Sequence, residues 1–336
     1  MKKYVASLKN IADDTGFSIT TISRVLQKKG EIGLETRKKV LASAEKLGYR
    51  PNLLINGMRT GKTKTIGVIM PVDEGFFSDI IRGIHDSLIQ KDYVPILIWP
   101  SSDGNNEKEQ IHRLIEHRVE GIIIRPMEDE AKKDHFNEIY ERGIPVVTVD
   151  RQLTYVDFDY VGSDDYLGAS MATRLLISLG HKRIGHLQGP QFASPAKLRR
   201  KGFEDSVAKS RGVSGIVSEN ELFTYDVSEA SDFLRKNPDV TAVFAANDLA
   251  AASVFAAATG LGLKIPQDLS VIGYGNLTFG QWMNPSISTV NQFPYEIGEN
   301  AVELLFKQIS KKTEKKKLRT LLTKPELIVR QSTTKT

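Results

Sequence analysis

The chain has 336 residues, a net charge of +5 and no cysteine, and its length predicts two or three folding units. The missing cysteine excludes a disulfide scaffold, a thiolate metal site and a cysteine nucleophile. Because no run approaches ~18 consecutive apolar residues and the opening residues MKKYVASLKN lack the apolar region of a signal peptide, we expect a cytoplasmic protein.

The charge is distributed unevenly along the chain. Residues 1–62 contain thirteen Lys and Arg against five acids, a net charge of +8, which leaves −3 for the remainder. A small basic head on a slightly acidic body is typical of a polyanion-binding module attached to a second domain. Charge alone is equally compatible with an ordinary solvated surface.

The basic head has the pattern of three short helices. Ser7 can cap the first helix, and Gly16 supplies the positive φ that a tight turn needs. Ser18 can cap a second helix, and a third runs from about Leu34 to Leu47. The second helix presents one apolar face, formed by Ile22, Val25 and Leu26. Two helices joined by a short turn that contains glycine predict a helix-turn-helix.

Apolar, strand-like runs and amphipathic helices alternate from Thr65 onward. The apolar runs lie at residues 65–70, 95–99, 121–125, 145–150, 183–188, 241–247 and 269–275. The clearest amphipathic stretches are Phe77–Lys91, Lys108–His117 and Tyr166–Leu179. Strands that are apolar on both faces and followed by helices predict parallel sheets covered by helices. Two doubly wound sheets suit the length better than one, with a (β/α)₈ barrel as the alternative.

Several of these segments together resemble a known family. SLKNIADDTGFSITTISRVLQ and ETRKKVLASAEKLGYRPN resemble the lactose-repressor/galactose-repressor family of transcription regulators. The later blocks FFSDIIRGI, IPVVTVD, SLGHKRIGHLQGP, AVFAANDLAA and LSVIGYGN are similar to that family's sensor domain, itself similar to periplasmic sugar-binding proteins. The resemblance implies an α/β fold with an N-terminal helix-turn-helix DNA-binding domain and a two-subdomain, doubly wound parallel-sheet sensor, and it argues against the barrel.

The resemblance also implies the domain limits. They are a helix-turn-helix domain over 1–51, a hinge over 52–64, and a ligand-sensing and dimerisation domain over 65–336. The chain would cross between the subdomains of the sensor near Asp164, Asn291 and Lys324. Subdomain 1 would comprise 65–164 and 292–324, and subdomain 2 would comprise 165–291 and 325–336.

The start of the second helix is expected to read bases in the major groove. Arg24 can bond a guanine bidentately, Thr20 can hydrogen-bond or touch a thymine methyl, and Ile19 offers apolar contact. The alternatives are core packing for Ile19 and a phosphate contact for Arg24. Hydroxyl groups at a helix start suit phosphate contacts. The other DNA contacts implied by the resemblance are Ser18, Thr21, Ser23 and Tyr49.

The segment Asn52–Arg59 matches the family's hinge helix, which enters the minor groove of the operator. Met58 stands where the family usually places a Leu wedge that unstacks a base step, and Asn52 and Ile55 are the other expected contacts. Gly57 costs helix propensity of about 1 kcal/mol relative to alanine. An ordinary disordered linker is the alternative.

The family match places the effector cleft where the carboxyl ends of strands from both subdomains face each other. Its expected contacts are Phe76, Phe77, Asp150, Arg151, Arg199, Tyr225, Asn247 and Gly275. Arg199 is the strongest of these as an exposed cleft arginine, and Tyr225 should follow a short strand at Leu222-Phe223. The competing interpretations are core packing for Phe77, a solvent ion pair for Arg151, an N-cap for Asn247 and a solvated basic face for Arg199. Gly275 replaces an aspartate frequent in sugar-binding members, which favours an anionic or larger ligand.

The predicted function is a sequence-specific transcription regulator, by resemblance a repressor. It would bind double-stranded operator DNA as a homodimer, with the helices at 79–91 and 248–259 as candidate dimer surfaces. A small-molecule effector, a sugar derivative or an anionic metabolite, would change its operator affinity. The alternative is a dimeric regulator whose sensor has lost its ligand. Because the histidines show no metal spacing and no G-x-S-x-G or Walker A sequence occurs, we expect no enzymatic activity, metal or cofactor.

Overall fold

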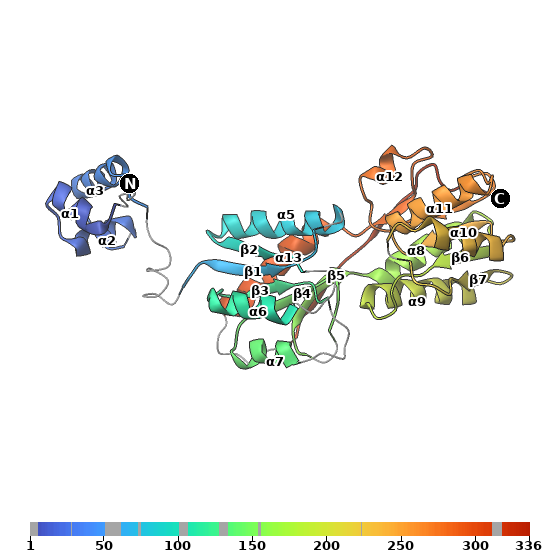
Figure 1. The fold of residues 1–336 in the computed structure, drawn as a ribbon, viewed down its shortest axis with the longest axis horizontal. Coiled ribbons are helices and arrows are strands. Elements are labelled where there is room, and N and C mark those ends of the chain that lie inside the picture. Colours follow the sequence, from blue (N-terminus) through green and yellow to red (C-terminus); the bar gives the residue numbers. More distant parts are fainter. Residues whose placement is uncertain are drawn as a thin grey trace. The chain divides into compact units, whose positions relative to one another are not determined.

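The computed structural model describes residues 6–27, 29–50, 62–72, 75–100, 107–127, 134–153, 156–222, 224–310 and 318–336 (Figure 1). The chain divides into two compact units, Met1–Thr63 and Lys64–Thr336. None of the helices within the described ranges has the length and apolar content needed to cross a lipid bilayer.

The N-terminal unit is a three-helix domain made of α1 (Leu8–Thr15), α2 (Ile19–Leu26) and α3 (Leu34–Lys46). Ser7 caps α1 in a capping box, and Gly16 ends it at φ 75°. Ser18 caps α2 by accepting a hydrogen bond from the Thr21 N–H. The core of the unit consists of Ile11, Ile22, Val25, Val40 and Ala44. These features confirm the helix-turn-helix predicted from the sequence.

A polar contact fixes α1 against α3. The Ser43 hydroxyl donates to Asp14 Oδ2 at 2.6 Å, and Lys46 Nζ lies 2.9 Å from Asp14 Oδ1. The hydrogen bond from Ser43, followed by that from Lys46, lowers the pKa of Asp14. This contact holds the scaffold on which α2 lies.

The first sheet of the larger unit is parallel, with strand order β11-β5-β4-β3-β1-β2. Its strands are β1 (Thr65–Ile69), β2 (Val94–Ile98), β3 (Ile122–Ile124), β4 (Val146–Val149), β5 (Asp159–Ser163) and β11 (Thr320–Thr323). Its helices are α5 (Gly75–Gln90), α6 (Glu107–Glu116), α7 (Asp134–Glu141) and α13 (Pro294–Ser310). Alternate strand residues pack against α5 and α13 in one core and against α6 and α7 in another, so both faces are covered.

The second sheet is also parallel, with strand order β7-β6-β8-β9. Its strands are β6 (Arg183–Leu187), β7 (Ser214–Val217), β8 (Ala242–Ala245) and β9 (Ser270–Ile272). Its helices are α8 (Asp165–Ser178), α9 (Ser194–Ala208), α10 (Val227–Lys236), α11 (Asp248–Gly260) and the short α12 (Phe279–Trp282). Helices α8 and α9 pack on one face, and α10 and α11 pack on the other. Two open, doubly wound sheets confirm the predicted fold class and exclude the barrel.

The chain passes between the two sheets three times (Figure 1). It leaves the first sheet after β5 for α8, and it returns from β10 (Thr289–Asn291) to α13. It leaves again after β11 for β12 (Glu326–Ile328), which pairs antiparallel with β10.

The expected strand at Leu222-Phe223 is wrong, because Leu222 lies in a loop and its N–H donates to the Gln188 carbonyl. Phe223 lies outside the described residues.

Helices α5 and α13 meet at two glycines. A Cβ atom on Gly83 would overlap the Tyr295 carbonyl oxygen, and one on Gly298 would overlap the Ile80 carbonyl oxygen. The helix axes can therefore approach closely only while both positions lack a side chain.

Gly83→Ala should destabilise the larger unit by about 1–3 kcal/mol, because the added methyl group forces α5 away from α13. Gly260→Ala at the end of α11 is the matched control, since no atom lies within 4 Å of the Cβ it would add. Urea denaturation of the full chain followed by circular dichroism measures both. Equal stabilities for the two variants would contradict the close approach.

Candidate functional site

The exposed side of α2 carries the residues expected to read bases. Ile19 is 49% exposed, whereas Ile22 and Val25 on the opposite side are buried. Thr20 and Arg24 are exposed beside Ile19. Ile19 is thus not part of the core. Its side chain is exposed on the same side of α2 as that of Arg24.

The hydroxyl-bearing residues of α2 have local partners. The Ser18 and Thr21 hydroxyls lie 2.9 Å apart, and Gln27 Nε2 donates to Ser23 Oγ at 3.1 Å. Tyr49 packs against the edge of the three-helix core, and burial raises its pKa. The predicted hinge contacts Asn52, Ile55 and Met58 lie outside the described residues.

A cavity of about 30 Å³ lies between the two sheets of the larger unit. It is lined by Phe76, Phe77, Asp150, Arg199, Asn247, Tyr274, Gly275, Leu277 and Gln292. Six of the eight predicted effector contacts therefore come together, and Tyr274, Leu277 and Gln292 are additions that the sequence did not indicate. The volume is enough for one or two water molecules.

Arg199 forms the floor of this cavity, and it is buried rather than exposed as expected. Its Nε donates to Asp165 Oδ1 at 2.8 Å, Nη1 to the Ala246 carbonyl at 2.8 Å, and Nη2 to Gln292 Oε1 at 3.1 Å. Its Cζ lies 3.9 Å from the centroid of the Tyr274 ring. Both the exposed cleft arginine and the solvated basic face are therefore wrong for this residue.

Asp165, the partner of Arg199, is the first residue of α8 and is 2% exposed. Burial raises its pKa to about 6, although the Arg199 charge opposes that shift. The Asp150 carboxylate raises it further. Burial, followed by the Asp165 carboxylate, holds the pKa of Tyr274 well above its usual value.

A second buried ion pair lies on the other side of the cavity. Arg125 Nε donates to Asp150 Oδ2 at 3.1 Å, and both side chains are less than 10% exposed. The Arg125 guanidinium also lies 5.0 Å from the centroid of the Phe77 ring. Phe77 belongs to the core of the first sheet and also faces the cavity, so core packing and cavity lining are both correct for it.

Two predicted contacts do not line the cavity. Tyr225 is 56% exposed and lies elsewhere. Arg151 Nη1 donates to the Met127 carbonyl at 3.0 Å, and its guanidinium lies 5.0 Å from the Phe192 ring centroid. Since Phe192 precedes α9, Arg151 connects the two halves of the larger unit instead of pointing into the cavity.

Asn247 and Gly275 both line the cavity, and the local backbone determines which residue fits at each position. Asn247 caps α11 by accepting the Ala250 N–H, as its competing interpretation predicted. Gly275 has φ 128°, a conformation that L side chains rarely adopt. A Cβ atom there would lie 3.7 Å from Asp248 Oδ2, beside a buried carboxylate that already accepts from the Thr289 hydroxyl and the Leu277 N–H. An aspartate at this position would therefore be strained by the backbone and would lie beside a second carboxylate.

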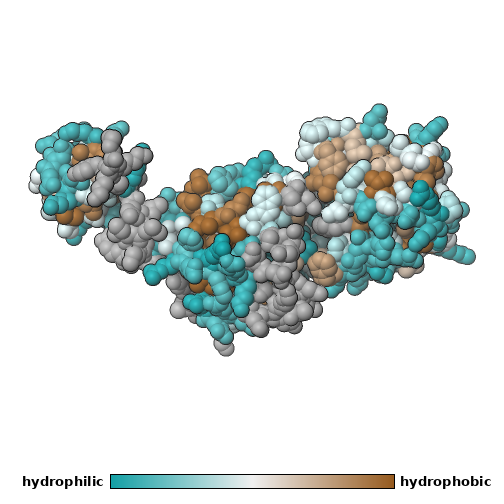
Figure 2. All heavy atoms as spheres, in the orientation of Figure 1, coloured by the Kyte–Doolittle hydropathy of each residue, from teal (hydrophilic) through white to brown (hydrophobic). Residues whose placement is uncertain are grey.

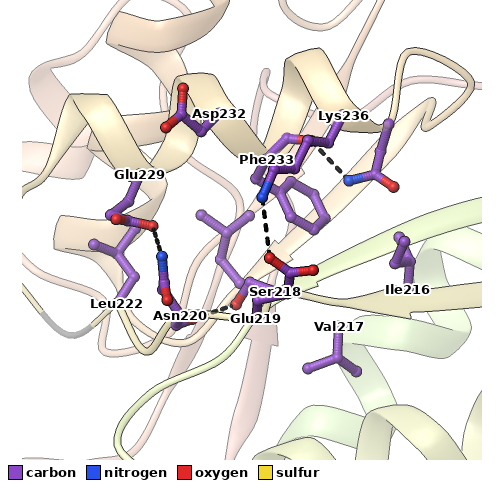
Figure 3. A pocket seen from close by; sticks show the side chains of 12 residues that line it. Ile216, Val217, Ser218, Glu219, Asn220, Leu222, Glu229, Asp232, Phe233 and Lys236 are labelled. Atoms are coloured by element: carbon purple, nitrogen blue, oxygen red, sulfur yellow. Dashed lines mark hydrogen bonds and ion pairs between the residues drawn. The ribbon is translucent and has the colours of Figure 1, made fainter.

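A larger hollow of about 190 Å³ lies between β7 and α10, on one side of the second sheet (Figure 3). Leu187, Ile216 and Phe233 form its floor, and the exposed pair Lys236–Glu219 spans its mouth. Every lining residue lies on a strand, helix or loop of the half that holds the second sheet, so a ligand there would contact only that half of the larger unit. The smaller cavity, lined from both halves, is the better candidate.

Comparisons with known proteins agree with this geometry. Residues 7–52 match the family described as bacterial regulatory proteins, lacI family, and residues 173–333 match a periplasmic binding protein-like domain. The HTH-type transcriptional repressor PurR of Mannheimia succiniciproducens is 30% identical over 336 residues, which cover 98% of this chain and 99% of that protein.

Two solved structures are similar in fold. The Lac repressor dimer bound to operator and the anti-inducer ONPF matches at a TM-score of 0.85 and 22% identity, covering 98% of this chain and 100% of that one. A LacI family transcriptional regulator from Enterococcus faecium with bound ribose matches at a TM-score of 0.69 and 27% identity, covering 80% and 98%.

Replacing Arg199 by alanine should cost about 3–5 kcal/mol of stability, because it leaves Asp165 buried without its charge partner. The loss should be smaller at about pH 5 than at about pH 7.5, since the unpaired carboxylate can take up a proton at the lower pH. Arg200→Ala is the control, because the Arg200 side chain is 40% exposed, its ion pair with Glu204 lies on the surface, and its other hydrogen bond is a part-buried one to Gln188 Oε1. Urea denaturation measures both. A loss for Arg199→Ala as small as that for Arg200→Ala would contradict the buried pair.

Proposed function

Because this chain belongs to the lacI family of bacterial regulatory proteins, we propose that it is a transcription repressor whose operator affinity is set by a small molecule bound between the two sheets. One observation carries the proposal. The chain combines a helix-turn-helix whose second helix exposes Ile19, Thr20 and Arg24 with a polar cavity lined from both halves of a doubly wound domain. The relative from Mannheimia succiniciproducens, similar over almost its whole length, is a transcriptional repressor.

The N-terminal unit binds the operator through α2 in the major groove. The exposed Arg24 suits bidentate contact with guanine, and Thr20 and Ile19 suit a thymine methyl. Ser18, Thr21 and Ser23 contact phosphates together with the N–H groups at the start of α2. Tyr49 supports the helix from the domain edge, and Asn52, Ile55 and Met58 continue the contact into the minor groove. Because bacterial chromosomal DNA lies in the cytoplasm, this proposal includes a cytoplasmic location.

The effector is a neutral, hydroxyl-rich metabolite such as a sugar. Arg199, the only arginine among the described residues that line the cavity, already has the Asp165 carboxylate at 2.8 Å, and Arg125 behind the cavity is paired with the lining residue Asp150 at 3.1 Å. An anion would therefore meet no uncompensated positive charge there. The rings of Phe76, Phe77 and Tyr274 offer apolar faces that suit a sugar ring. The Enterococcus faecium relative holds ribose. This argument replaces the anionic ligand that Gly275 suggested.

The functional unit is a homodimer, as in the Lac repressor dimer bound to operator. Two-fold related half-sites in DNA require two copies of α2. Apolar residues gather over α5 and around α11 and α12 (Figure 2). Trp282 at the end of α12 is 77% exposed, and Ile89 on α5 is 52% exposed. We place the dimer contacts on these two surfaces, one on each subdomain of the sensor. Subdomain 1 comprises 65–164 and 292–324, and subdomain 2 comprises 165–291 and 325–336.

A regulator that only dimerises and has lost its ligand remains the second candidate, because the cavity of about 30 Å³ is small. Selection of bound DNA from a random pool by the full chain, with and without a panel of neutral sugars and polyols, separates the two. The effector proposal expects one enriched palindrome whose recovery changes with a panel member. Unchanged recovery across the panel supports the second candidate, and recovery without any enriched sequence contradicts both.

Arg24→Ala should weaken binding to the selected operator by about 1–3 kcal/mol and relax the preference at one base pair in each half-site. Lys9→Ala, an exposed change on α1, should weaken operator and random DNA equally if it has any effect. Fluorescence anisotropy on both DNAs measures this. An equal loss on random DNA for Arg24→Ala would make Arg24 a phosphate contact.

Trp282→Glu should shift dimers toward monomers, because it places a charge in an apolar contact. Operator affinity should fall with the dimer, whereas Tyr140→Glu, at a 57% exposed site on α7, should leave both unchanged. Analytical ultracentrifugation over a dilution series gives the dimer dissociation constant. A dissociation constant for Trp282→Glu that matches wild type would move the interface away from α12.

A further inference from the structure

The cavity floor holds a charge balance that depends on one carboxylate. Arg199 uses three of its five N–H groups, on Asp165, Ala246 and Gln292, which leaves two N–H groups on a residue that lines the cavity. Arg199 therefore keeps unused donor groups on a residue of the cavity lining, while its charge is balanced by Asp165. Side chains of Asp165 and Arg199 are 2% and 5% exposed, so solvent does not screen the pair.

The charged and titratable groups that act most strongly on Asp165 lie on neighbouring elements. Arg199 on α9 is the cation, Asp150 after β4 is a second carboxylate, and Tyr160 and Tyr274 carry neutral phenols. Asp150 in turn is paired with Arg125. Arg199 is therefore paired with Asp165 and Arg125 with Asp150, whereas the buried Asp248 beside Gly275 accepts from Thr289 and Arg151 donates to the Met127 carbonyl. The Arg199–Asp165 pair is electrically neutral when Asp165 is ionised.

We propose that Asp165 determines the charge of the effector, because by neutralising Arg199 it makes the cavity accept neutral polyhydroxy ligands and exclude anions. This inference rests on the proposed function, since it concerns the same effector site. It assigns specificity to a residue that does not itself line the cavity.

The physical reason is the cost of an unpaired buried charge. An anion that binds Arg199 in the wild-type protein either leaves the Asp165 carboxylate without its compensating charge or forces it to take up a proton. A neutral hydroxyl group can accept from the two remaining N–H groups without disturbing the pair. When Asp165 is replaced by a neutral isostere, Arg199 becomes an uncompensated cation, and an anion becomes its natural partner.

The burial of Asp165 also allows its charge to be changed by pH. Because the pKa of Asp165 is raised to about 6, the carboxylate is ionised at neutral pH and protonated in mild acid. Protonation should then do in the wild-type protein what Asp165→Asn does at any pH. Anion binding that requires this proton should strengthen about tenfold for each pH unit lowered toward the pKa and level off below it.

The test is calorimetric titration of the full chain with sodium sulfate, a simple dianion that does not titrate in this range. Asp165→Asn should bind sulfate at least tenfold more tightly than wild type at about pH 7.5. Asp164→Asn is the matched control, because it removes the same charge from the adjacent residue while asparagine keeps the N-cap of α8. It should behave as wild type does.

Measuring sulfate affinity against pH tests the proposal on the wild-type protein, even if the Asp165→Asn variant folds poorly. Wild-type sulfate affinity should rise as the pH falls from about 7.5 to 6, whereas that of Asp165→Asn should stay flat over this window. Equal sulfate binding by wild type, Asp165→Asn and Asp164→Asn, or a wild-type affinity independent of pH, would overturn the proposal.

The proposed function can fail separately. If Asp165→Asn gains sulfate binding but no neutral sugar changes operator affinity, the charge assignment stands and the effector function fails. If a neutral sugar changes operator affinity but Asp165→Asn gains no anion binding, the function stands and this assignment is overturned.

Discussion

The buried ion pair between Arg199 and Asp165 is the interaction on which the sensor depends. It joins the start of α8 to α9, and through Ala246 and Gln292 it reaches the end of β8 and the segment that returns to the first sheet. Tyr274 stacks on the same guanidinium. Neither charge could stay buried without the other, so the floor of the cavity, the packing of two helices and two of the chain crossings are fixed together.

The small volume of the cavity limits how a ligand could enter it. The cavity of about 30 Å³ is too small for a sugar ring, so entry requires the two halves to separate around the crossings near Asp164, Asn291 and Lys324. Contacts on the outer side of the cleft resist that separation. They include the Gln152 N–H donated to Ser194 Oγ at 3.0 Å and the Arg151 guanidinium over Phe192. A ligand that replaces these contacts shifts the balance between open and closed forms only by its differential affinity for the two.

The sequence predicted the features that depend on local patterns. Ser7, Gly16 and Ser18 mark helix ends because capping needs only neighbouring residues. Buried strands such as β1 and β4 were found because they are apolar on both faces. Strands β5, β7, β10, β11 and β12 were not among the predicted apolar runs. Strands β7 and β11 lie partly or wholly exposed at sheet edges, β10 and β12 are three-residue strands of a two-stranded pair, and the buried β5 begins and ends with the polar residues Asp159 and Ser163. Their apolar pattern is correspondingly weak.

The cavity was only partly predictable because its chemistry depends on distant partners. Arg199 was correctly placed there, but its basic neighbours Lys197, Arg200 and Lys201 suggested exposure. Its partners Asp165 and Gln292 lie 34 and 93 residues away along the chain. No local signal could link them. Tyr225 was misplaced for the same reason, because proximity to a strand end does not fix the direction of a loop.

The central claim is that one ligand site and one DNA site are energetically coupled, and reciprocity tests it most directly. Operator affinity is measured with and without the neutral sugar or polyol that changes it most, and the affinity for that ligand is measured by calorimetry with and without operator. The account predicts that both affinities change by the same factor, about 5- to 150-fold. Ligand binding that leaves operator affinity unchanged, with operator binding that leaves ligand affinity unchanged, would contradict it.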